Sequence, residues 1–116
     1  MAAHRFYIVD VFAEEKLAGN QLAVVLDAAD LTGAEMRRIA NEMSYSETTF
    51  IMSGEQRDGG YDVRIFTPVR EVPFAGHPTL GTAYVLQREV TGRPVETVVL
   101  NLEVGQIPVQ IHYSGD

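Results

Sequence analysis

The chain has 116 residues, of which 46% are hydrophobic and 22% charged, as is usual for a globular domain. Its net charge of −7 comes without a basic cluster, which argues against nucleic acid or an anionic membrane as a partner. The absence of cysteine excludes thiol nucleophiles, disulfides and thiolate metal sites. No stretch approaches membrane-spanning length and the start lacks a signal peptide's apolar core, so we expect a cytoplasmic protein.

The first part of the chain predicts two strands and a helix. Residues 5–12 carry apolar side chains on both alternating faces, which predicts a strand covered on both sides. Residues 21–26 predict a second strand. Thr32 and Glu35 fit a capping box, and apolar residues then recur at the spacing of one helical face, so we expect a helix over 32–43 that covers a sheet.

A polar turn then leads into a strand that begins near Glu47. A glutamate at the start of a strand can act as a general base, or it can simply be a solvated residue where the strand begins. Composition alone favours the solvated residue. Residues 54–60 predict a hairpin-like loop. Residues 61–66 are rich in β-branched and aromatic types and predict a strand that Pro68 ends.

The chain is organised around a helix predicted over residues 79–90, with Pro78 at the first helical position. Its sequence is apolar on nearly every side, so we expect the helix to be enclosed. Free amides at its start, beside His77, suit a carboxylate or a phosphate, although His77 could simply cap the helix. Gly92 predicts the end of the helix.

The last part of the chain predicts two strands, over residues 95–103 and 107–113, that form a hairpin around Gly105. Pro108 suits an edge strand, because proline has no N–H to donate to a neighbouring strand.

Taken together, several segments resemble a known family. They are Asp10-Val-Phe12, Gly19-Asn20, Leu22-Ala-Val-Val25, Ser46-Glu-Thr-Thr-Phe50, Arg64-Ile-Phe-Thr-Pro68, Glu71 and Pro73-Phe-Ala-Gly-His-Pro-Thr-Leu-Gly-Thr-Ala83. In this order and at this spacing they look like the amino-terminal half of the phenazine-biosynthesis PhzF-like proteins, which have the diaminopimelate-epimerase fold. The resemblance covers essentially all of the chain.

The resemblance implies an α+β fold, in which a curved, mostly antiparallel or mixed sheet wraps around the central helix of residues 79–90. The helix over 32–43 would lie outside this sheet. Family members have two such halves with the active site in the cleft between them. Residues 1–116 would then be a single domain that corresponds to the first half, with the second domain absent.

The resemblance also implies which residues form the site. Glu47 would be the general acid/base that moves a proton between substrate carbons, and His77 would hold or polarise the substrate. The expected substrate-binding residues are Ser46, Gly76, Pro78 and Thr79. No metal and no organic cofactor is implied. We expect Phe50 and Tyr45 to shield Glu47 from water, and Ala75 stands where the two-thiol racemases of this fold carry their first cysteine.

The implied function is a cofactor-independent isomerase or epimerase acting on a small carboxylate, dihydro-hydroxyanthranilate-like or amino-acid-like. Two features depart from the family pattern. Gln21 stands where members usually carry proline, and nothing resembles the Asp-Pro-Ala-Thr-Gly-Ser-like segment of their second half. The chain is therefore an excised amino-terminal domain, a homodimer whose second copy replaces the missing half, or a non-catalytic, self-associating binding or assembly module.

Overall fold

A computed structural model describes residues 5–11, 20–43, 47–92 and 95–111. Its strands are β1 (Phe6–Val11), β2 (Asn20–Val25), β3 (Glu47–Ile51), β4 (Tyr61–Phe66), β5 (Glu71–Val72), β6 (Thr97–Leu102) and β7 (Gly105–Gln110). Its α-helices are α1 (Gly33–Met43) and α2 (Gly76–Val85), and a π-helical segment (Leu86–Thr91) continues α2. A short 3-10 helix spans Ala28–Asp30.

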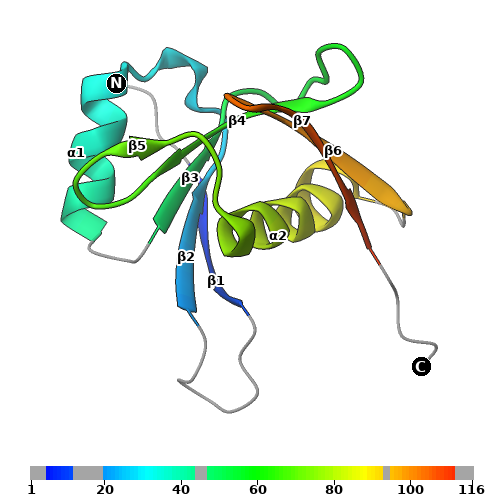
Figure 1. The fold of residues 1–116 in the computed structure, drawn as a ribbon, viewed down its shortest axis with the longest axis horizontal. Helices are drawn as coiled ribbons and strands as arrows, with labels where there is room; N and C mark the ends of the chain where they lie inside the picture. Colours follow the sequence, from blue (N-terminus) through cyan, green and yellow to red (C-terminus); the bar gives the residue numbers. More distant parts are fainter. Residues whose placement is uncertain (1–4, 12–19, 44–46, 93–94, 112–116) are drawn as a thin grey trace.

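The strands lie in the order β1-β2-β3-β4-β6-β7, with β5 beside β4. Two pairs, β2 with β3 and β4 with β6, are parallel, and the other pairs are antiparallel. This mixed sheet curves around α2, while α1 lies on its outer face (Figure 1). The α+β fold expected from the resemblance is confirmed.

Each face of the sheet has its own hydrophobic core. Between the sheet and α2 lies a large cluster to which both contribute side chains, among them Leu22, Val24, Ile65, Ala83, Leu86 and Leu100. Between the sheet and α1 lies a smaller cluster of Val25, Ala28, Met36, Ala40, Phe50 and Phe66. Along β2, β3 and β4, side-chain alternation directs neighbouring residues into different clusters.

Most of the local predictions are confirmed. In the capping box of α1, the Thr32 N–H donates to Glu35 Oε1 at 2.9 Å and the Glu35 N–H donates to Thr32 Oγ1 at 3.1 Å. Gly92 adopts a left-handed conformation, with φ of 72°, where the helix ends. The β6–β7 hairpin turns just before Gly105, and β7 is an edge strand, as Pro108 indicated.

Three expectations about the strands and the central helix are wrong, and one strand was missed. Helix α2 begins at Gly76, so Pro78 lies within its first turn and not at its first position. The two-residue strand β5 was not predicted, since it is too short to show a pattern. Strand β1 is not covered on both sides, and α2 is not enclosed. Phe6 is 53% exposed and Ile8 43%, and on α2 Leu80 is 41% exposed and Tyr84 48%.

The exposure has a simple geometric reason. The curved sheet leaves part of α2 uncovered, and α1 packs on β3 and β4 without reaching the outer face of β1 (Figure 1). Within the described ranges, no helix is long and apolar enough to cross a membrane.

Candidate active site

Glu47 is the first residue of β3 and is half-buried. Thr49, two residues later, lies on the same face of the strand, because strand side chains alternate. The Thr82 hydroxyl of α2 donates a hydrogen bond of 2.8 Å to Thr49 Oγ1. Glu47 therefore belongs to the face of the sheet that packs against α2.

The expected shielding of Glu47 by Phe50 is wrong. Phe50 lies an odd number of residues along the strand and packs in the α1 cluster, with its ring 5.4 Å from that of Phe66 in an edge-to-face arrangement. Tyr45 and Ser46 lie outside the described residues.

The start of α2 holds the other predicted site residues. Gly76 is exposed, and apart from its chain neighbours and its own helix backbone, no atom of the described residues lies within 4 Å of where a Cβ on Gly76 would be. The N-cap residue Ala75 makes no side-chain capping bond. Backbone approach to this end of the helix is therefore open, as the small residues had indicated.

Pro78 and Thr79 are buried in the first turn of α2. The Thr79 hydroxyl donates to the Ala75 carbonyl at 2.6 Å, and the Thr79 N–H approaches the same oxygen at 3.2 Å. The Thr79 hydroxyl proton is thus used within the helix. His77 is part of α2, but its side chain lies outside what the structure describes.

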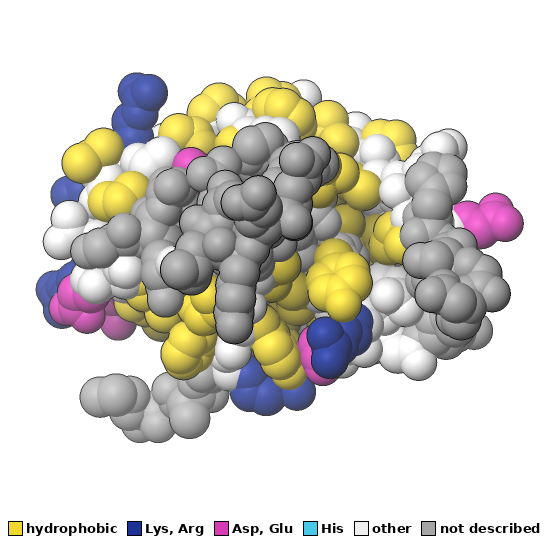
Figure 2. Space-filling model, turned by 90° about the horizontal axis from the view of Figure 1, so that it is seen from below, with side chains coloured by type: hydrophobic (Ala, Val, Ile, Leu, Met, Phe, Trp, Pro, Cys, Tyr) yellow, Lys and Arg dark blue, Asp and Glu magenta, His cyan; other side chains and the backbone are white. Residues whose placement is uncertain are grey.

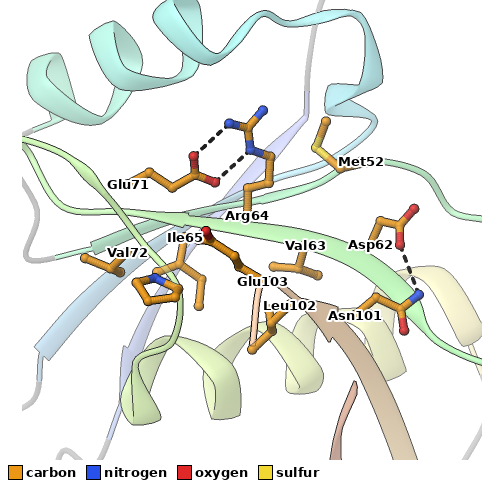
Figure 3. A pocket seen from close by; sticks show the side chains of 11 residues that line it. Met52, Asp62, Val63, Arg64, Ile65, Glu71, Val72, Asn101, Leu102 and Glu103 are labelled. Carbon is orange, nitrogen blue, oxygen red and sulfur yellow. Dashed lines mark hydrogen bonds and ion pairs between the residues drawn. The ribbon is translucent and has the colours of Figure 1, made fainter. Parts of the chain in front are cut away.

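Glu47 lies on β3, and the other described site residues lie at the start of α2. The hydrogen bond between Thr49 and Thr82 joins these two elements. Neither of them lines the pocket shown in Figure 3, which has a volume of about 420 Å³ and lies where β4, β5 and the end of β6 meet. The sequence reasoning missed this pocket.

Arg64 and Glu71 both line that pocket and form an ion pair (Figure 3). Arg64 Nε donates to Glu71 Oε2 at 2.8 Å, and Arg64 Nη2 donates to Glu71 Oε1 at 2.7 Å. The hydrogen bond from Arg64 lowers the pKa of Glu71 below its ordinary value, although partial burial acts the other way. The Arg64 guanidinium also lies 5.6 Å from the centre of the Phe66 ring.

This ion pair positions the chain that leads into α2. Glu71 begins β5, and α2 starts only four residues after the end of β5 at Val72. Both Arg64 and Glu71 belong to the segments that carry the family resemblance, which was the available signal. Sequence alone did not show that they form a pair, because they lie on different strands.

A second polar network joins the loop before β4 to β6. Asp62 accepts hydrogen bonds from Arg57 Nε at 3.0 Å and from Asn101 Nδ2 at 3.0 Å. The bond from Arg57 is the largest cause that lowers the pKa of Asp62. In the part of the chain that the structure describes, no three histidine or acidic side chains gather as metal ligands would.

A family profile described as phenazine biosynthesis-like protein matches residues 9–116. The chain belongs to this family. It is 47% identical over 105 residues to the trans-2,3-dihydro-3-hydroxyanthranilate isomerase of Pseudomonas aeruginosa, a match that covers 90% of this chain and 36% of that protein. The isomerase of the same name from Pseudomonas fluorescens is 55% identical over 84 residues, or 72% of this chain and 30% of that protein.

Solved structures of the family agree with the fold. A PhzF-family protein of Enterococcus faecalis superposes with a TM-score of 0.83 at 38% identity, over 94% of this chain and 40% of that one. A predicted epimerase of Pseudomonas aeruginosa gives a TM-score of 0.84 at 34% identity, over 97% of this chain and 40% of that one. These matches thus cover between 30% and 40% of the family members' own length.

Proposed function

We propose that this chain forms one wall of the active site of a cofactor-independent isomerase that moves a proton between carbons of a small carboxylate. The similarity to the Pseudomonas aeruginosa isomerase over 90% of the chain carries the proposal. The substrate would be dihydro-hydroxyanthranilate-like or amino-acid-like. A second domain, or a second copy of the chain, would supply the opposite wall.

Glu47 is the proton shuttle in this proposal. Its carboxylate removes a proton from one carbon, the electron pair of the broken C–H bond moves through the adjacent double bond, and the same carboxyl returns the proton to another carbon. This proton shift moves the double bond within the substrate and needs no oxidant or reductant. Support comes from the place of Glu47, half-buried at the start of β3 on the face that packs against α2.

The start of α2 binds the substrate carboxylate. The first amides of a helix carry partial positive charge, and Ala75 offers no side chain that competes for them. Gly76 leaves room for close approach. His77 holds or polarises the substrate, and Ser46 adds a hydroxyl. Pro78 and Thr79 shape the helix start, since the Thr79 hydroxyl proton already bonds to Ala75.

The test uses a chimera in which this chain replaces the matching segment of the Pseudomonas aeruginosa isomerase. Deuterium uptake from heavy water into trans-2,3-dihydro-3-hydroxyanthranilate reports proton transfer. We expect Glu47→Gln to slow uptake by about a hundredfold or more. Glu42→Gln is the matched control, because Glu42 is an exposed glutamate on α1.

Retained uptake in the Glu47→Gln chimera would show that Glu47 is not the base. A folded chimera that binds the substrate without turning it over would favour the alternative, a non-catalytic binding or assembly module. The exposed apolar side chains of β1 and α2 are the observation that supports this second candidate.

A further inference from the structure

A groove lies between α1 and the turn that joins β4 to β5, and it carries positive charge in a chain whose net charge is −7. Its volume is about 580 Å³, and it is lined by Ala34, Arg37, Arg38, Asn41, Pro68 and Val69. The four helical members recur at the spacing of one helix face, so they form a stripe along α1. Asn41 Nδ2 donates to the Pro68 carbonyl at 3.1 Å and joins the two walls (Figure 1).

The arginines of this surface have no anionic partner in the described part of the chain. Arg37 and Arg38 on α1 and Arg70 at the end of the turn are exposed, and none of the three makes an ion pair there. By contrast, Arg57 and Arg64 each bind a carboxylate. In Figure 2 several basic side chains lie toward the left, the side on which Figure 1 places α1. Their charge is therefore available to an anionic group from outside the chain.

The turn that forms the second wall is held in one shape by its own hydrogen bonds. The Thr67 N–H donates to the Arg70 carbonyl at 2.8 Å. Thr67 Oγ1 accepts hydrogen bonds from the Val69 N–H at 3.3 Å and from the Arg70 N–H at 3.2 Å. Val69 lies at the tip of this turn and is 74% exposed. A partner that binds here does not have to order the turn first, which removes part of the entropy cost of association.

Positive charge beside a fixed apolar side chain defines the chemistry of a partner. Carboxylates match the fork of an arginine guanidinium, so acidic side chains suit Arg37 and Arg38. An apolar side chain between those carboxylates would cover Val69 and Pro68, which a small inorganic anion would leave exposed. The rest of this acidic chain repels an acidic partner, so the groove also determines where such a partner docks.

We propose that the groove between α1 and the β4–β5 turn docks an acidic segment of another protein, one that carries an apolar side chain between its carboxylates. Arg37 and Arg38 bind the carboxylates, and Val69 with Pro68 packs against the apolar side chain. The charge complementarity steers the encounter, and the apolar contact slows dissociation. This proposal does not depend on the proposed isomerase activity, because neither Glu47 nor the start of α2 lines the groove.

The test follows the backbone amide signals of the 116-residue chain by NMR while the blocked peptide Glu-Glu-Leu-Glu-Glu is added. We expect the amides of Arg37, Arg38, Val69 and Arg70 to shift most, with a Kd of about 1 mM or tighter at low salt. The matched peptide Glu-Glu-Gln-Glu-Glu lacks the apolar side chain and should bind about threefold more weakly, or worse. Raising the salt concentration to about 0.3 M should weaken both complexes, because salt screens exposed charges.

Variants of the chain locate the contact. Arg37→Gln and Arg38→Gln should each weaken binding of the leucine peptide by about twofold to fivefold, and Val69→Ser by about threefold. Arg88→Gln is the matched control, because Arg88 is an exposed arginine on the π-helical segment after α2 and does not line the groove. It should leave binding unchanged. All four side chains are exposed, and circular dichroism checks that each variant keeps its fold.

An absence of shifts at these amides with the leucine peptide would overturn the proposal. So would equally tight binding of the glutamine peptide, or an equal loss of binding in Arg88→Gln. The same signals distinguish two other occupants of the groove. If they shift when the chain alone is concentrated, a second copy fills the groove. If the chimera with the Pseudomonas aeruginosa isomerase binds no peptide, the second half of that protein covers the groove, and either result would refute docking of a separate acidic partner.

Discussion

The neighbouring residues Thr48 and Thr49 should respond to the same substitution with opposite signs. Both are fully buried on β3. Thr49 Oγ1 accepts the 2.8 Å hydrogen bond from Thr82, whereas Thr48 Oγ1 is buried without a hydrogen-bond partner among the described residues. Valine has nearly the shape of threonine, so each change to valine tests the hydroxyl group and little else.

A buried polar group without a partner costs roughly 1–3 kcal/mol. Thr48→Val removes that cost, and we expect the free energy of unfolding to rise by about 1 kcal/mol. Thr49→Val instead leaves the Thr82 hydroxyl unpaired, and should lower the free energy of unfolding by about 1–3 kcal/mol. The double variant Thr49→Val with Thr82→Val should recover most of this loss, since both partners are then apolar.

The assay is urea unfolding followed by circular dichroism, with the slope of the transition checked for constancy between variants. A shift of about 1 kcal/mol corresponds to roughly 4 °C in the melting temperature of a domain of this size. If Thr48→Val destabilises the chain as much as Thr49→Val does, the reasoning from hydroxyl pairing is refuted.

Two further substitutions test other contacts. A Cβ on Gly60 would lie 2.5 Å from Asn101 Oδ1, so Gly60→Ala should lower the free energy of unfolding by about 1–3 kcal/mol in urea denaturation, while Gly54→Ala, with only ordinary contacts, changes little. Because Arg64 lowers the pKa of Glu71, the ion pair stabilises the fold above the ordinary carboxyl pKa, and this contribution is lost as pH falls through the lowered pKa. Unfolding free energies measured from about pH 6 to about pH 3 should therefore fall less steeply for Glu71→Gln than for the unaltered chain, and equal slopes would contradict this.

Local features of the fold followed from the sequence alone. The capping box of Thr32 and Glu35 and the end of the helix at Gly92 depend on interactions among residues close in the chain. The strand over residues 61–66 followed from its β-branched and aromatic side chains. The family also followed from the sequence, because its motifs lie at fixed spacings and the profile matches residues 9–116. The roles of Glu47 and His77 remain predictions.

The tertiary structure decided which apolar surfaces are covered. Apolar sequence on both faces of β1 and around α2 predicted burial, yet Phe6, Ile8, Leu80 and Tyr84 stay exposed. Burial depends on which elements arrive beside a strand or helix, and a residue's own neighbours in sequence do not carry that information. For the same reason only the fold paired Arg64 with Glu71 across two strands, whereas the alternation of side chains along β3 already implied that Phe50 faces away from Glu47.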